Sequence, residues 1–222
     1  WLLQDLCGDH NSDPLLYNWA FNGVMDQPDQ QPGRIILIDK PLRWTSFDVV
    51  NKLRHKLKIK KIGHAGTLDP LATGLLILCT GKMTKRIDEF QAQEKEYTGT
   101  FTLGQTTPSY DLETELSSPM DSSHITDEMV HSATKKFIGT IQQTPPLHSA
   151  IKVDGKRAYE LAREGKDITL QAREVEIKEF EITKIEKPVV TFRVVCSKGT
   201  YIRSLAHDVG KALGVGAHLS SL

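Results

Sequence analysis

The chain has 222 residues, of which 39% are hydrophobic and 25% charged, a composition typical of a globular protein with one substantial core. No apolar run approaches membrane-spanning length, and the three cysteines, Cys7, Cys79 and Cys196, form no CxxC pair. We therefore expect no membrane segment, no metal site, and free thiols in a reducing compartment.

The formal net charge of zero hides an uneven distribution. Residues 1–33 contain five aspartates and no lysine or arginine, so the rest of the chain carries 28 basic and 23 acidic side chains. Six of the basic residues fall within Lys52–Lys61. Such a cluster suits a polyanion, although a solvated helix face explains it about as often. We interpret residues 1–33 as an atypical N-terminal extension, in which the pattern of a secretory signal is not found.

The first elements after this extension follow simple apolar patterns. The run from Arg34 to Asp39 predicts a buried strand, which Lys40-Pro41 ends. Thr45 or Ser46 then provides an N-cap for a helix that extends to about Leu57.

The stretch Gly63–Lys85 carries the strongest local signals in the chain. Its glycines permit tight turns, and Pro70 restricts the backbone of Asp69, so we expect Asp69 on a stiff loop. Leu75–Cys79 predicts a buried strand, and helical spacing follows over Met83–Gln93. An Asp-Pro pair is most often only a turn, so the loop alone does not establish a catalytic residue.

The second half alternates between strands and helices. We expect a loop region over residues 104–125 and little regular structure around Thr144-Pro145-Pro146. The expected strands are Glu96–Leu103, Ser149–Val153, Glu174–Ile185 and Val189–Cys196, and the expected helices are Asp127–Ile138, Lys156–Glu164 and Tyr201–Leu213. Together these elements predict an α/β (α+β) protein with a mixed, largely antiparallel sheet and flanking helices.

Three stretches resemble the TruB family, the synthases that make pseudouridine in tRNA. They are Gly63-His64 with Gly66–Gly74, then Lys95-Glu96-Tyr97 with Leu103-Gly104, and Cys196–Arg203. They occur in the family's order, and the resemblance extends from about Arg34 to Leu222. It implies one catalytic domain over residues 34–222 with the pseudouridine synthase fold.

The resemblance also implies a reaction and its partner. The family converts uridine to pseudouridine in the T-loop of tRNA, at position 55. The base is detached from the ribose and reattached through C5, so no atoms are gained or lost and we expect no cofactor. The expected partner is the T-arm of tRNA, and we expect a monomer in the cytoplasm.

Three residues match the family's catalytic positions. Asp69 is the implied nucleophile or charge stabiliser, acting either on the ribose carbon or by starting loss of a ribose proton. Because burial would favour its neutral form, a fixed cation is needed, and Arg203 is the family counterpart. Tyr97 matches the tyrosine that stacks on the target base and assists at C5.

The remaining matches concern substrate binding. His64 corresponds to the histidine that helps to displace uridine from the RNA stack. In the family the Lys-Pro pair supports the active-site loop, a role that the resemblance implies for Lys40, although the pair is about as often a simple strand terminator. Leu222 aligns with a family leucine that lines the uracil pocket. The segment of about residues 142–170 resembles a mobile thumb, whose cations are expected to contact phosphates: Lys152, Lys156 and Arg157.

Two departures leave alternatives open. Ala65 stands where Thr is frequent, and the chain stops at Leu222, before the end of the catalytic domain and the PUA-like RNA-binding domain that are usual in the family. A non-catalytic tRNA-binding or tRNA-folding module with the same fold is therefore the alternative to an isomerase. A glycoside hydrolase would need a second carboxylate, and the signature stretch contains only Asp69.

Overall fold

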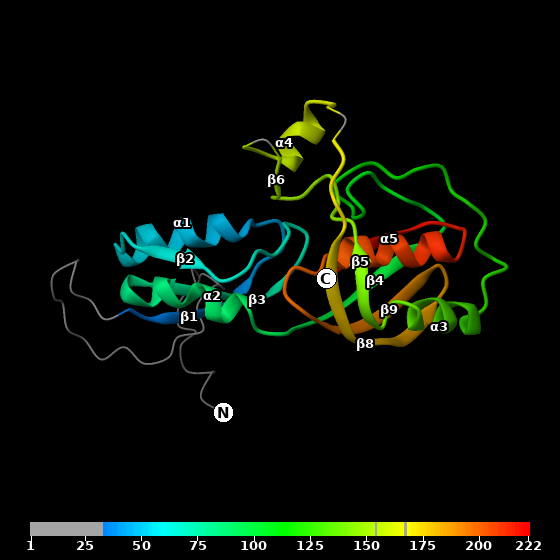
Figure 1. The fold of residues 1–222 in the computed structure, drawn as a ribbon, viewed down its shortest axis with the longest axis horizontal. Helices are drawn as coiled ribbons and strands as arrows, with labels where there is room; N and C mark the ends of the chain where they lie inside the picture. The colour runs from blue at the N-terminus through cyan, green and yellow to red at the C-terminus, as the bar shows by residue number, and fades with distance from the viewer. Residues whose placement is uncertain (1–32, 154, 167) are drawn as a thin grey trace, which may run out of the picture. The chain divides into compact units, whose positions relative to one another are not determined.

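The computed structural model describes residues 33–222 apart from residues 154 and 167 (Figure 1). The predicted extension over residues 1–33 therefore lies almost entirely outside the described residues. The chain divides into two compact units between Gln91 and Ala92, and each is considered by itself below. Within the described residues, no helix has the length and hydropathy needed to cross a bilayer.

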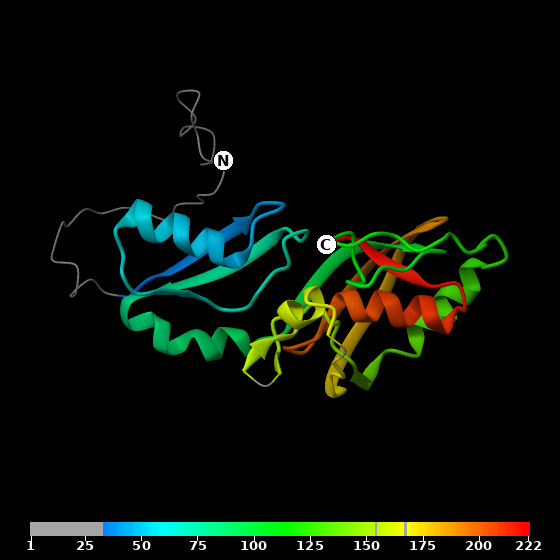
Figure 2. The same ribbon diagram turned by 90° about the horizontal axis from the view of Figure 1, so that it is seen from above.

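The first unit is built on a three-stranded antiparallel sheet in the order β1-β3-β2. Its strands are β1 (Ile35–Lys40), β2 (Ile62–His64) and β3 (Gly74–Thr80). Helix α1 (Ser46–Leu57) covers one face, and the 3-10 turn η1 (Gly81–Arg86) with α2 (Ile87–Gln91) lies on the other (Figure 2). The apolar core between α1 and the sheet comprises Ile38, Val49, Val50, Leu53, Ile62, Leu76 and Leu78.

Helix α1 starts where the sequence predicts. Thr45 is the N-cap, and its hydroxyl accepts a hydrogen bond from the Asp48 N–H at 3.0 Å. The Asp48 carboxylate in turn accepts from the Thr45 N–H at 2.8 Å, which completes a capping box. The start of α1 is thus fixed by side chains that the sequence supplies locally.

The second unit holds a five-stranded antiparallel sheet in the order β10-β4-β9-β8-β5. Helix α5 (Ile202–Ala212) contributes Ile202, Leu205, Ala206 and Val209 to its core, and α3 (Asp127–Lys135) contributes Val130. The strands are β4 (Lys95–Leu103), β5 (Gly139–Gln143), β8 (Arg173–Glu186), β9 (Val189–Cys196) and β10 (Ala217–Ser221).

A small insertion separates β5 from β8 in the second unit. It contains the hairpin of β6 (Lys152–Val153) and β7 (Lys156–Arg157), followed by α4 (Ala158–Arg163). Figure 1 shows α4 and β6 projecting from the sheet that carries α5. This insertion occupies the residues for which the sequence predicts a thumb.

The α/β class and the main elements are confirmed, with local corrections. Ile35, Leu37 and Leu75 are 43%, 51% and 64% exposed, so neither β1 nor the start of β3 is buried throughout as predicted. The expected helix from Lys156 starts only at Ala158, because Lys156 pairs with Val153 in the hairpin. The short strands β2, β5 and β10 were not predicted, since too few residues carry their alternation.

Gly210 marks a close approach of α5 to the segment leading into β10, and its replacement tests the packing of this layer. A Cβ atom there would lie 2.1 Å from the Ala217 nitrogen, so Gly210→Ala should lower the free energy of unfolding by about 2 kcal/mol despite the better helix propensity of alanine. Chemical denaturation gives the value. Lys211→Ala, at an exposed neighbouring position, is the control and should change the free energy of unfolding by less than about 0.5 kcal/mol. An equally small effect of Gly210→Ala would contradict the close approach of α5 to Ala217.

Candidate functional site

The loop that carries Asp69 connects β2 to β3 and is held by its own backbone and by the start of α1. The Ala72 N–H donates to the Asp69 carbonyl at 3.0 Å, which closes a turn around Pro70. The Ser46 hydroxyl accepts from the Leu68 N–H at 3.0 Å and lies 3.3 Å from the Leu68 carbonyl. Asp69 itself is half-buried, so its carboxylate sits on a fixed turn with partial access to solvent.

Lys40 joins three segments around this loop. Its side chain is 0% exposed, and its ammonium donates to the carbonyls of Trp44 at 2.6 Å, Pro41 at 3.1 Å and Pro70 at 3.4 Å. Burial lowers the pKa of Lys40, while the carboxylates of Asp69 and Asp48 act to raise it. Lys40 therefore meets protein carbonyls instead of solvent, and its charge lies within electrostatic range of Asp69.

His64 ends β2 on the other side of the loop. It pairs with Leu78 in the β2–β3 register, and its Nδ1 lies 2.5 Å from the Gly66 carbonyl. Gly66 has φ = 111°, a conformation that favours glycine. The histidine ring is thus oriented by a turn that depends on the neighbouring glycine.

Arg203 lies in the first turn of α5 in the second unit and is 3% exposed. Its guanidinium donates to the Ser109 carbonyl and to the His148 carbonyl, both at 3.0 Å. Its Nε lies 3.6 Å from Oδ2 of Asp111, which is also 3% exposed. A guanidinium stays charged when buried, and these acceptors fix its plane.

Asp111 is a buried partner of Arg203 that the sequence did not reveal. Its Oδ1 accepts from the Glu113 N–H at 3.0 Å, and its carbonyl accepts from the Thr107 hydroxyl at 2.6 Å. The region 104–125 is predicted as a polar loop, and polar loops are normally solvated. The only signal was the concentration of hydroxyl residues before Asp111, which can satisfy buried backbone groups.

Gln143 is a second residue that sequence reasoning missed. It ends β5, is 1% exposed, and forms two hydrogen bonds to the backbone of Tyr201. Its Oε1 accepts from the Tyr201 N–H at 2.7 Å, and its Nε2 donates to the Tyr201 carbonyl at 3.1 Å. The Ser204 hydroxyl also donates to the Thr144 carbonyl at 2.8 Å. The start of α5, which carries Arg203, is therefore fastened to the segment that leads into the insertion.

Tyr97 and Leu222 lie against the same core. Tyr97 is half-buried on β4, opposite Val194 of β9. Leu222 follows β10, and both side chains pack on the apolar core of the second unit. A Cβ atom at Gly99 would lie 3.2 Å from a Leu222 methyl carbon, so this glycine permits the close approach of the last residue.

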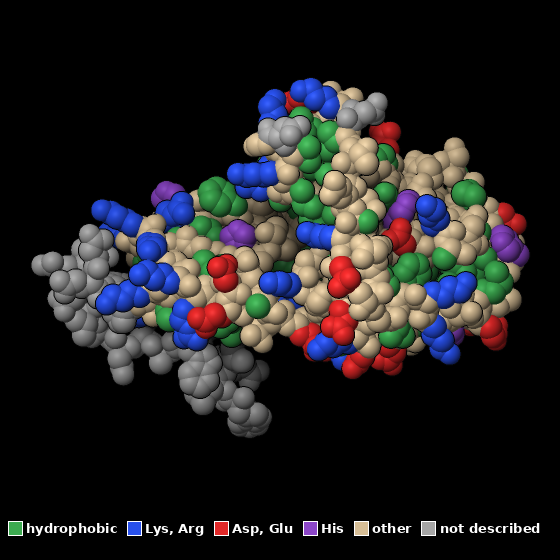
Figure 3. Space-filling model, viewed as in Figure 1, with side chains coloured by type: hydrophobic (Ala, Val, Ile, Leu, Met, Phe, Trp, Pro, Cys, Tyr) green, Lys and Arg blue, Asp and Glu red, His purple; other side chains and the backbone are tan. Residues whose placement is uncertain are grey.

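The basic residues of the insertion lie together on its hairpin. Lys152 pairs with Arg157 in the β6–β7 register, and all three cations are exposed. Lys156 lies 3.8 Å from Glu164, while the Arg157 guanidinium donates to the Ala150 carbonyl at 3.3 Å. Figure 3 shows Lys and Arg side chains gathered on the outer part of this insertion. Exposed cations grouped on one hairpin are suited to contacts with phosphates, which do not depend on sequence.

The candidate residues thus form groups within each unit. Lys40 and Asp69 interact in the first unit, where His64 flanks the same loop. In the second unit, Tyr97 and Leu222 pack on one core, Arg203 is fixed at the start of α5, and the three thumb cations share a hairpin.

Comparison with protein families identifies the signature stretches. Residues 54–202 match the model described as TruB family pseudouridylate synthase (N terminal domain). The tRNA pseudouridine synthase B of Parabacteroides distasonis is 60% identical over 196 residues, which cover 86% of this chain and 83% of that protein. The protein of the same name from Flavobacterium johnsoniae is 58% identical over 197 residues, covering 86% of each chain.

Solved structures agree with this comparison. A chain in a Cbf5-Nop10-Gar1 complex superimposes with a TM-score of 0.65 at 31% identity, covering 96% of this chain and 54% of that one. A chain of an H/ACA RNP bound to a substrate RNA containing 2′-deoxyuridine gives a TM-score of 0.62 at 29% identity, covering 87% and 49%. The chain spans about half the length of these structures. The predicted pseudouridine synthase fold is confirmed, and the chain belongs to the TruB family of pseudouridylate synthases.

Proposed function

We propose that this chain isomerises uridine to pseudouridine in tRNA. The family match and the names of relatives that are 58–60% identical support this reaction. The structural observation that carries it is the anchored carboxylate of Asp69, half-buried on a turn that Ser46 and the buried ammonium of Lys40 hold in place. A reaction at one glycosidic bond needs one such carboxylate at a fixed position.

The proposed target is the T-loop uridine at position 55. The basis is the resemblance of Gly66–Gly74 and its flanking stretches to the family that acts there. RNA of this kind is recognised through loop shape and displaced bases. The exposed cations Lys152, Lys156 and Arg157 would contact the phosphates of the T-arm, which fixes the register without reading sequence.

Asp69 starts the reaction in this proposal. Its carboxylate promotes cleavage of the bond between N1 of the base and the ribose, by attack on the ribose carbon or by starting loss of a ribose proton. The detached uracil turns, C5 bonds to the ribose, and the C5 proton leaves while N1 gains one. The atoms balance without an oxidant, a reductant or an energy source.

Charge control is the task we assign to Lys40 and Arg203. A carboxylate that is partly removed from water is pushed toward its neutral form, and a neutral acid is a poor nucleophile. The Lys40 ammonium lies near Asp69 within the first unit. Arg203, permanently charged and rigidly bound, would supply the second positive charge.

The other residues handle the displaced base. Tyr97 would stack on it and assist proton removal at C5, and Leu222 would pack against the uracil. His64 would help to hold the uridine out of the RNA stack, a step that costs a few kcal/mol. The half-buried positions of all three side chains leave part of each surface available to a base.

A non-catalytic tRNA-binding module is the weaker alternative. The closely similar relatives carry the name of an enzyme, and the described site retains a buried, multiply bonded arginine and an anchored aspartate. A surface that only binds RNA needs neither, because exposed cations supply that affinity.

Replacing Asp69 tests the proposed reaction. Asp69→Asn should abolish tritium release from C5-labelled uridine in an unmodified tRNA transcript, since the amide cannot attack or accept a proton. The affinity for tRNA should change by less than about tenfold, roughly 1.4 kcal/mol. The wild-type chain should release about one equivalent per tRNA.

A transcript with cytidine at the T-loop position is the control, and it should release nothing. Continued release from Asp69→Asn would remove Asp69 from this role. Failure of the wild-type chain to release tritium, with salt-dependent tRNA binding intact, would favour the non-catalytic module.

Gln143 provides a test of how Arg203 is positioned. Gln143→Met keeps the volume but removes both bonds to Tyr201, so the single-turnover rate with saturating tRNA should fall by about tenfold or more. Gln143→Glu keeps an acceptor for the Tyr201 N–H and should show a smaller loss. The dissociation constant for tRNA should change less than threefold in both.

A merely structural role of Gln143 would give a different pattern. Both variants would then lose thermal stability, and their rates per folded molecule would equal that of the wild type. Rapid-quench measurement on samples whose folded fraction is known separates the two cases.

A further inference from the structure

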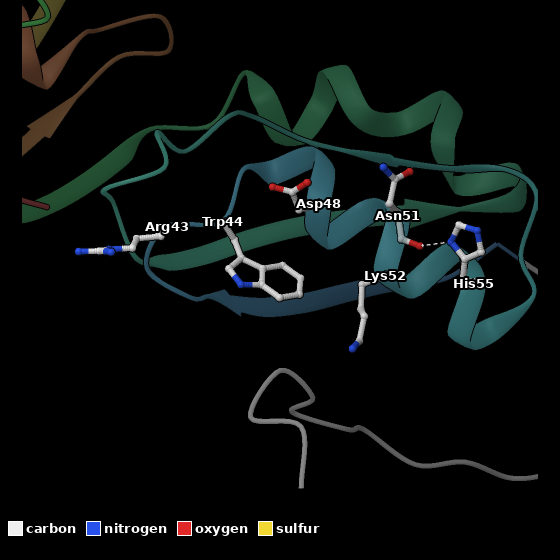
Figure 4. Close-up of a pocket in the computed structure, with 6 residues that line it drawn as sticks. All are labelled: Arg43, Trp44, Asp48, Asn51, Lys52 and His55. Atoms are coloured by element: carbon white, nitrogen blue, oxygen red, sulfur yellow. Dashed lines mark hydrogen bonds between the residues drawn. The ribbon is translucent and has the colours of Figure 1, made fainter. Parts of the chain in front are cut away.

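A groove along α1 contains none of the catalytic or substrate-binding residues proposed above. It has a volume of about 500 Å³, is open to solvent, and is lined by Arg43, Trp44, Asp48, Asn51, Lys52 and His55 (Figure 4). Figure 4 shows the Trp44 indole and the Lys52 side chain on the same side of α1, with Arg43 extending from the loop at one end. All six residues belong to the first unit.

The lining combines an aromatic face with positive charge. Trp44 packs one part of its ring on the core under α1 and stays half-buried, while Arg43, Lys52 and His55 are exposed. The one acid, Asp48, is engaged in the capping box, where its carboxylate accepts from the Thr45 N–H at 2.8 Å. An aromatic ring among cations is the arrangement that holds single-stranded nucleic acid, because every base has a face that can stack.

The backbone of Arg43 gives an independent indication. Its φ is 68°, in the left-handed region that residues other than glycine rarely adopt. Such strain persists where surrounding structure enforces it, and it is concentrated at functional sites. A long cationic side chain at a position where glycine would be more stable points to a use for that side chain.

Hydrogen bonds also connect two groove residues to the loop that carries Asp69 and to its support Lys40. The Arg43 N–H donates to the Pro70 carbonyl at 2.7 Å, and the Lys40 ammonium donates to the Trp44 carbonyl at 2.6 Å. Both residues that begin the groove are therefore bonded directly to the supports of the Asp69 turn. The Arg43–Pro70 bond places the Arg43 end of the groove next to the Asp69 turn, so an RNA strand that reached Asp69 would lie beside Arg43.

We propose that this groove binds the RNA strand next to the target uridine, with a base or ribose stacked on Trp44 and phosphates contacting Arg43 and Lys52. This deepens the proposed function and rests on it. The contact would resist the return of the displaced nucleotide to the stack. A protein partner is disfavoured, since the lining offers only one large apolar side chain among charged and polar ones.

Arg43→Gly is the most discriminating variant. It removes the cation and relieves the left-handed strain, so the melting temperature should be unchanged or higher while the dissociation constant for a T-arm hairpin RNA rises about fivefold. Lys52→Ala should weaken binding similarly and reduce the slope of log affinity against log salt by about one. Lys136→Ala, which removes one exposed charge at the end of α3, is the matched control and should bind as the wild type does.

Trp44 itself provides a spectroscopic readout. In a chain in which Trp1 and Trp19 are replaced by Phe, the hairpin should quench the remaining indole fluorescence as a base stacks on it. Trp44→Leu keeps an apolar side chain on the core and should raise the dissociation constant about tenfold. In turnover assays, the weaker binding of the Arg43, Lys52 and Trp44 variants should raise KM more than it lowers kcat.

The outcomes separate the groove from the proposed reaction. Wild-type turnover of the hairpin, together with unchanged affinity in Arg43→Gly and Lys52→Ala and no quenching of Trp44, would overturn the groove as an RNA site. Quenching by an unrelated acidic protein but not by the hairpin would do the same. Absence of wild-type turnover would refute the proposed function, while loss of affinity in the two variants would still support the groove.

Discussion

The buried ammonium of Lys40 is the interaction on which the first unit depends. Its three donors connect the end of β1 to the segment before α1 and to the turn after Asp69, through the carbonyls of Pro41, Trp44 and Pro70. Burying a lysine is unfavourable unless its protons are bonded, and the lowered pKa reflects this desolvation. Because one group satisfies two carbonyls of the segment before α1 and one carbonyl of the Asp69 loop, movement of either segment would leave a buried charge under-bonded. The loop that carries Asp69 is held in place through the bond to the Pro70 carbonyl.

The second unit uses the same principle with different groups. The Gln143 side-chain amide bonds to both the N–H and the carbonyl of Tyr201, as a neighbouring strand would. The Arg203 guanidinium donates to the carbonyls of Ser109 and His148 and faces Asp111. Gln143 and Arg203 are almost fully buried, so loss of these hydrogen bonds without replacement by water would destabilise the fold. Polar residues in this unit therefore orient α5 and the loop before Asp111, while the apolar core provides the bulk of the stabilisation.

The sequence predicted the elements with strong periodicity and missed those defined by tertiary contacts. Helix α1, the β8–β9 pair and α5 are found with boundaries within two residues, because capping and alternation are local signals. Short strands such as β5 exist only through their partners. Asp69 and Arg203 were proposed as site residues from their motifs. Asp111 and Gln143 were not, since a buried polar group is recognisable only from what surrounds it. The exposure of Leu75 was missed because a short apolar run does not show which of its side chains face solvent.

Amide hydrogen exchange in Lys40→Met would test most directly that the buried ammonium fixes the Asp69 loop. Methionine keeps the apolar stem and removes the three donors. The account predicts much faster exchange at Leu68 and Ala72, whose N–H groups bond to Ser46 and Asp69, with exchange in β8 and β9 unchanged. Unchanged protection of these two amides, with the variant folded, would contradict the central role of Lys40.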